Sequence, residues 1–130
     1  MMVVFQPLAS RADGIGRAIM GLCAAAALFA FVSGITSSVS PQLGWLTLWQ
    51  SWGFAMFAGL FALLALRSRL SPGLWELAFF HKLVLAISGF LSPTLPGAAD
   101  AGLFDAGLAA AIGLSYWLTK AWRGWQAVQS

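Results

Sequence analysis

Two neighbouring residues, His81 and Lys82, are the side chains of this chain that stand out as able to do chemistry. They lie inside segment 74–91, which is otherwise almost wholly apolar. An ammonium group at the centre of a membrane helix costs roughly 2.5–3.5 kcal/mol by insertion scales, so it normally has a partner or a function. An imidazole can hold a proton, a cofactor or a hydrogen bond. His81 and Lys82 therefore form the first candidate site.

Asp105, in a later apolar segment, is the predicted counter-ion of Lys82. At 1.5 Å of rise per residue, the Cα atoms of the two residues would differ in membrane depth by roughly 7 Å. A lysine stem can extend over that difference. Because either charge buried alone would be costly, we expect an ion pair that joins two helices. This favours a structural role for Lys82, and no catalytic residue is predicted.

His81 leaves three interpretations open. It could be a neutral imidazole hydrogen-bonded to a neighbouring helix. It could belong to a quinone headgroup site or a proton relay together with Lys82, Glu76 or Asp105. It could also be an axial ligand of a haem or chlorophyll-type pigment macrocycle. His81 is the only histidine of the chain, so bis-histidine haem ligation within one subunit is excluded.

Arg17 and Glu76 form a second candidate ion pair. Both are expected near one side of the membrane, so an Arg17–Glu76 contact would join the first and third apolar segments. Alternatively, Asp13 pairs with Arg17 at i,i+4 spacing, and Glu76 faces the lipid headgroups.

Motifs of soluble enzymes and metal sites are absent. The sequence contains no phosphate-binding glycine loop, HExxH or CxxC motif. Its single cysteine, Cys23, excludes an intrachain disulfide and a cysteine-rich metal site. Independent catalysis and metal binding are therefore not expected.

The composition places these residues in a membrane. Of the 130 residues, 60% are hydrophobic and only 8% are charged, whereas soluble domains carry about a quarter charged residues. Four apolar segments, each close to the ~20 residues that cross a bilayer, occupy residues 15–35, 46–66, 72–91 and 101–118. We expect an all-α polytopic membrane protein, a four-transmembrane-helix bundle that forms one domain over residues 1–130.

The basic residues predict the orientation. Six of the seven flank the same ends of the apolar segments: Arg11, Arg17, Arg67, Arg69, Lys120 and Arg123. The loops after the first and third segments contain no Lys or Arg. By the positive-inside rule, both termini are expected on the cytoplasmic side of a bacterial inner (plasma) membrane.

Tryptophans and small residues indicate packing surfaces. Trp45, Trp49 and Trp52 cluster at the expected outer end of the second segment, and four others lie near inner ends, as in two aromatic belts. The first three share one helix face, so contact with a partner protein is the alternative. Small residues spaced by four, at Gly21/Ala25, Ala55/Gly59 and Ala109/Gly113, predict close helix packing within a compact bundle; the alternative is a helix face that docks on another protein.

The order of these features resembles the DoxX-like group of small four-helix bacterial membrane proteins. The resemblance covers most of the chain and is carried by Gly34, Pro41, Gly44, Gly53, Gly59, the run Arg67-Ser68-Arg69 and Asp105. Lys82 and the tryptophan-rich helix ends depart from the group. The resemblance implies a link to quinone-coupled electron transfer or to partners in membrane redox complexes, and it transfers no catalytic residue.

Two functional hypotheses follow. The first is a non-catalytic accessory or stabilising subunit of a larger membrane complex, in electron transfer or photosynthesis, with other membrane subunits or a second copy as partner. The second is a protein that binds a quinone or another lipophilic small molecule at His81 and Lys82. A transporter ranks third, because no internal repeat is found. Nucleic acid is not expected as a partner, since the seven basic residues are scattered along the sequence.

Overall fold

The chain folds into helices joined by short loops. The computed structural model describes residues 10–129, and of Gln129 only the backbone. The helices are α1 (Arg11–Thr36), α2 (Pro41–Leu66), α3 (Leu74–Phe90), α4 (Ala98–Thr119) and α5 (Arg123–Gln129). Residues 10–129 contain no β-strand, so the all-α prediction is confirmed for this part of the chain.

Three of these helices are long and apolar enough to cross a membrane: α1, α2 and α4, with 26, 26 and 22 residues. The 17 residues of α3 make a helix about 25 Å long, short of the ~30 Å hydrocarbon core. Large apolar side chains cover the outside of the molecule; Leu22 and Phe29 are 72% and 75% exposed. A surface of this kind suits lipid rather than water, and indicates a multi-pass membrane protein.

The helix boundaries differ from the expected ones at their starts. α1 begins at Arg11 rather than at residue 15, because the Ser10 hydroxyl caps it by accepting a hydrogen bond from the Asp13 N–H at 3.1 Å. α2 begins at Pro41 rather than at residue 46, since proline fits the first helical turn. α3 begins after Gly73, whose φ of 92° is open to glycine and costly for other residues.

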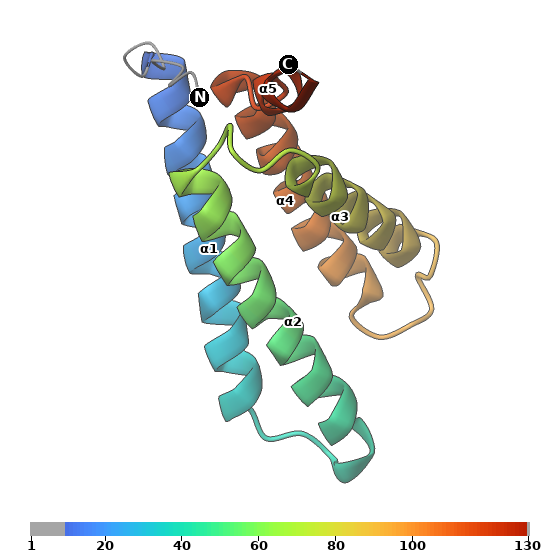
Figure 1. Ribbon diagram of the computed structural model, residues 1–130. Helices are drawn as coiled ribbons and strands as arrows, with labels where there is room; N and C mark the ends of the chain where they lie inside the picture. The colour runs from blue at the N-terminus through green and yellow to red at the C-terminus, as the bar shows by residue number, and fades with distance from the viewer. Residues whose placement is uncertain (1–9, 130) are drawn as a thin grey trace.

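The long helices form two hairpins that meet along one seam. α1 packs along α2, α3 packs along α4, and α1 also contacts α4, whereas α2 and α3 barely touch. Figure 1 shows the two hairpins spreading apart away from α5, with the first half of α2 projecting past the end of α3. The bundle is therefore open on the side between α2 and α3.

The buried core lies where the two hairpins converge. Its largest fully buried apolar side chains come from all four long helices: Met20, Phe61, Leu64, Trp75 and Ile112. Trp75 donates its indole N–H to the Ser68 carbonyl at 2.9 Å, which fixes the start of α3 to the preceding loop. The core thus holds the converging ends together and leaves the other ends of the hairpins apart.

Glycines bring α3 and α4 into close contact. A Cβ atom on Gly89 would lie 2.5 Å from the Ala98 carbonyl oxygen and 2.9 Å from the Gly102 Cα atom. The small-residue pairs expected from the sequence do not act in this way: a Cβ on Gly21 or Gly59 would meet nothing within 4 Å. The prediction of close packing within the bundle is wrong at those two positions, because their faces of α1 and α2 point away from the other helices; docking of these faces on another protein stays a prediction.

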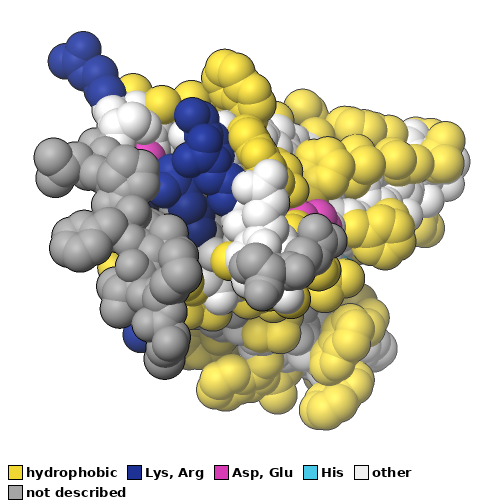
Figure 2. Space-filling view, turned by 45° about the horizontal axis from the view of Figure 1, so that its top comes forward, with side chains coloured by type: hydrophobic (Ala, Val, Ile, Leu, Met, Phe, Trp, Pro, Cys, Tyr) yellow, Lys and Arg dark blue, Asp and Glu magenta, His cyan; other side chains and the backbone are white. Residues whose placement is uncertain are grey.

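A fifth helix, absent from the sequence prediction, folds back at the converging ends. α4 ends at Thr119, the next residue, Lys120, has a left-handed φ of 54°, and α5 follows from Arg123. We call this region the basic end, because it gathers Arg17, Arg67, Arg69, Lys120 and Arg123. Figure 2 looks onto it and shows dark-blue Lys and Arg side chains close together, with yellow apolar side chains along the flanks.

Candidate functional site

Lys82 is the central residue of α3 and is only 2% exposed. Its Nζ atom lies 3.3 Å from Oδ1 of Asp105 on α4, which is 8% exposed. The structure thus brings these two candidate residues together across the α3–α4 contact. A buried charge that loses such a partner is strongly destabilising, by about 3–5 kcal/mol, so the pair locks α3 to α4.

Two phenylalanines of α2 complete the surroundings of Lys82. The Nζ atom lies 4.1 Å from the ring centroid of Phe57 and 5.9 Å from that of Phe54. A desolvated ammonium over an aromatic face gains about 2 kcal/mol. Because α2 and α3 otherwise barely touch, this contact makes Lys82 a tie between α2, α3 and α4.

His81 also contacts Phe57 but, unlike Lys82, lies at the surface of α3. Its ring is exposed and packs on Phe57, with ring centroids 4.8 Å apart and a 32° angle between the planes. No hydrogen bond joins His81 to another residue of the part of the chain that the structure describes. The imidazole borders a hollow of about 300 Å³ between α2 and α3, here called the α2–α3 groove, lined by Met56, Phe57, Leu60, Leu74, Leu77, Ala78 and His81.

Arg17 caps the end of α2. Its guanidinium donates to the carbonyl oxygens of Ala65 at 2.6 Å and Leu66 at 3.3 Å. The last carbonyls of a helix lack hydrogen-bond donors within the helix and carry partial negative charge. The Arg17 guanidinium supplies both the donors and a positive charge. Asp13 Oδ2 lies 3.9 Å from Arg17 Nη1, and Asp13 Oδ1 lies 3.8 Å from Arg69 Nη2. Of the two arrangements open from the sequence, the structure forms the Asp13–Arg17 contact.

The proposed Arg17–Glu76 pair is absent from the described residues. Glu76 Oε1 instead accepts hydrogen bonds from the Tyr116 hydroxyl at 3.0 Å and the Trp125 indole N–H at 2.8 Å. The reason is the order of the helices in space: α1 packs on α2 and α4 and is not a neighbour of α3. The prediction of an Arg17–Glu76 ion pair is therefore wrong.

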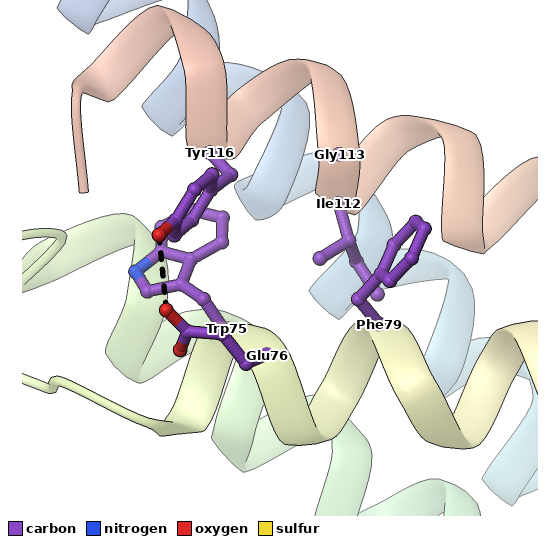
Figure 3. A pocket seen from close by; sticks show the side chains of 6 residues that line it. All are labelled: Trp75, Glu76, Phe79, Ile112, Gly113 and Tyr116. Carbon is purple, nitrogen blue, oxygen red and sulfur yellow. Dashed lines mark hydrogen bonds between the residues drawn. The ribbon is translucent and has the colours of Figure 1, made fainter. Parts of the chain in front are cut away.

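A second hollow, of about 310 Å³, lies between α3 and α4, on a different side of α3 from His81. We call it the α3–α4 pocket; it is lined by Trp75, Glu76, Phe79, Ile112, Gly113 and Tyr116. Figure 3 shows the Glu76–Tyr116 hydrogen bond at one end and Phe79 with Ile112 at the other. Sequence reasoning missed this pocket, because Tyr116 and Trp125 lie 40 and 49 residues from Glu76 in the chain.

The three tryptophans at the start of α2 are on the surface. Trp45, Trp49 and Trp52 are 72%, 70% and 60% exposed. Trp52 also packs against Phe31 of α1, with ring centroids 5.2 Å apart. All three belong to the first half of α2, the half that projects past α3 in Figure 1.

Comparisons of the chain with protein-family models, curated proteins and solved structures give no match.

Proposed function

We propose that this protein is a non-catalytic accessory subunit of a larger membrane complex, and that its α2–α3 groove receives a transmembrane helix of another subunit. One observation carries the proposal: α2 and α3 barely touch, although α1 packs on α2 and α3 packs on α4. The bundle is thus open on its α2–α3 side. Among helices in lipid, association is driven by van der Waals packing, which such an apolar concave face supplies.

The use of the polar groups supports a structural role. Lys82 contacts Asp105 and the Phe57 ring, and Arg17 contacts backbone carbonyls. Arg69 likewise donates to the Thr119 carbonyl at 2.9 Å and ties the loop before α3 to α4. Catalysis needs acid, base or nucleophilic groups that converge on a substrate. These groups instead contact one another or the backbone.

The membrane context belongs to the same proposal. α3 would be the fourth span, completed at its ends by flanking loop residues, with both termini on the cytoplasmic side of a bacterial inner membrane. The basic end would then face the cytoplasm, as the positive-inside rule requires. The resemblance to DoxX-like proteins suggests a complex of electron transfer as the setting. Trp45 and Trp49, on the projecting part of α2, would extend the contact with the partner.

The test is to fill the groove. Leu77 lines it and is 65% exposed, and Leu103, outside both hollows, is 64% exposed. Leu77→Trp and Leu103→Trp would each be purified in a gentle detergent from the native membrane and sized by native mass spectrometry. We expect the wild type and Leu103→Trp to carry the same partner subunit and Leu77→Trp to lose it. Retention of that subunit at unchanged stoichiometry by Leu77→Trp would contradict the proposal.

A second candidate function rests on His81. The exposed imidazole is the polar group on the wall of an otherwise apolar groove, which is the arrangement that a quinone headgroup uses. Lys82 lies next to it in sequence, but its Nζ is already paired. If the groove holds a quinone, solvent extraction of purified protein yields about one quinone per chain, and His81→Ala reduces that yield severalfold. Extracts with phospholipid alone would exclude this function.

A further inference from the structure

The α3–α4 pocket combines a carboxylate with aromatic walls. Trp75 and Tyr116 meet edge to face with centroids 6.0 Å apart, and Phe79 forms the opposite wall (Figure 3). Glu76 lies beside Tyr116, at the end of the pocket away from Phe79. Aromatic faces beside a negative group are the recurrent way in which proteins hold organic ammonium ions, because the ring quadrupole attracts a cation without a hydrogen bond.

Glu76 retains capacity for such a ligand. Tyr116 and Trp125 donate to its Oε1 atom, and the backbone N–H groups of Gly73 and Glu76 also hydrogen-bond to the carboxylate. Within residues 10–129, no Lys or Arg side chain lies within ion-pair distance of this carboxylate. These neutral donors fix the orientation of the carboxylate and leave its negative charge available.

The two ends of the pocket differ in polarity. Its polar end, at Glu76 and Tyr116, is the end nearer the basic end of the molecule. Its other end, under Gly113 and between Phe79 and Ile112, lies further along both helices and is wholly apolar (Figure 3). A ligand that fits therefore carries a cationic head and an apolar tail that runs into the membrane.

We propose that the α3–α4 pocket binds a phospholipid with an ammonium headgroup. The ammonium ion lies between the Glu76 carboxylate and the Tyr116 ring, and one acyl chain runs over Gly113 along Phe79. This site is independent of the α2–α3 groove and of the proposed subunit contact.

The experiment compares two lipids that differ in their headgroup. The full chain, in nanodiscs of equal parts phosphatidylethanolamine and phosphatidylglycerol with identical acyl chains, is released and analysed by native mass spectrometry. We expect one retained phosphatidylethanolamine at about fivefold preference over phosphatidylglycerol. Ethanolamine, a water-soluble ammonium ion, is added in a second arm and should not displace it. No preference, or displacement by ethanolamine at millimolar concentration, would overturn the proposal.

Two variants with matched controls locate the site. Glu76→Gln keeps the shape and removes the charge, so the headgroup preference should fall below about twofold; Asp100→Asn, an acidic position outside the pocket, should keep it. Gly113→Leu fills the acyl end, where a Cβ would meet the Phe79 ring at 3.5 Å, and should abolish retention. Gly107→Leu, on the same helix with nothing within 4 Å of a Cβ, should not. Unchanged retention in both pocket variants would overturn the assignment.

Discussion

At the scale of single residues, the centre of the molecule depends on Lys82. Its ammonium group contacts Asp105 on α4 and the Phe57 ring on α2, so one side chain joins three helices. Lys82 is only 2% exposed, so water cannot replace these partners, and a lysine there without them would destabilise the fold. The two contacts therefore account for the position of Lys82.

The Lys82–Asp105 pair can be tested by a double-mutant cycle. Lys82→Ala should lower the free energy of unfolding by about 3 kcal/mol, because it leaves Asp105 as an unpaired buried charge. The double variant Lys82→Ala/Asp105→Ala should lose much less than the sum of the single variants. Reversible unfolding in mixed micelles, followed by tryptophan fluorescence, measures all four proteins. Strict additivity would show that the two charges do not interact.

The residues of the candidate site differ in how far the sequence reveals them. Lys82 and Asp105 can be matched by counting depth along two helices, because both are charges in apolar segments and lack other partners. Glu76 could not be matched in this way. Its partners, Tyr116 and Trp125, are common interfacial aromatics, and one of them lies on a helix that the hydropathy pattern does not reveal.

At the scale of helices, close approach is set by particular glycines. Gly89 of α3 faces the backbone of Ala98 and Gly102 on α4, with no room for a side chain. Gly107, also on α4, faces open space. Spacing alone does not separate these two kinds of glycine, because small residues recur throughout apolar helices. Only the packing of α3 on α4 decides which of them is required.

Alanine substitutions at Gly89 and Gly107 should therefore have different effects on stability. Gly89→Ala should destabilise the protein by about 2 kcal/mol, since its Cβ would lie 2.5 Å from the Ala98 carbonyl oxygen and force the helices apart. Gly107→Ala should be neutral or stabilise by up to about 1 kcal/mol, because alanine favours helix and meets no atom there. Unfolding in mixed micelles measures both. Equal effects at the two positions would refute the α3–α4 contact.

The helix boundaries show what hydropathy can and cannot predict. The end of α2 at Leu66 is visible in the sequence, because the polar run Arg67-Ser68-Arg69 follows directly. The start of α2 at Pro41 is not, since its first turn is not strongly apolar and proline and glycine there suggest a loop. α5 is short and begins directly after the last apolar segment, so no gap in hydropathy marks it.

At the scale of the whole molecule, the arrangement predicts a topology with α3 as the fourth span. Single cysteines would be placed at Ser38, Leu70 and Thr94, all exposed and in three successive loops, after Cys23, which is buried, is replaced by serine. A membrane-impermeant maleimide should label Ser38→Cys and Thr94→Cys from outside intact cells, and Leu70→Cys only after permeabilisation. Equal labelling of Leu70→Cys and Thr94→Cys would mean that α3 does not cross the membrane.

We propose that the open α2–α3 side of the bundle receives a helix of another membrane subunit. Photocrosslinking in the native membrane gives a direct test, with benzoylphenylalanine in place of Trp49, which borders the proposed contact without filling the groove, and in place of Leu103 as a similarly exposed control. We expect a discrete protein adduct at position 49 and only lipid adducts at position 103. Lipid adducts alone at both positions, from cells with the native partners present, would contradict the proposal.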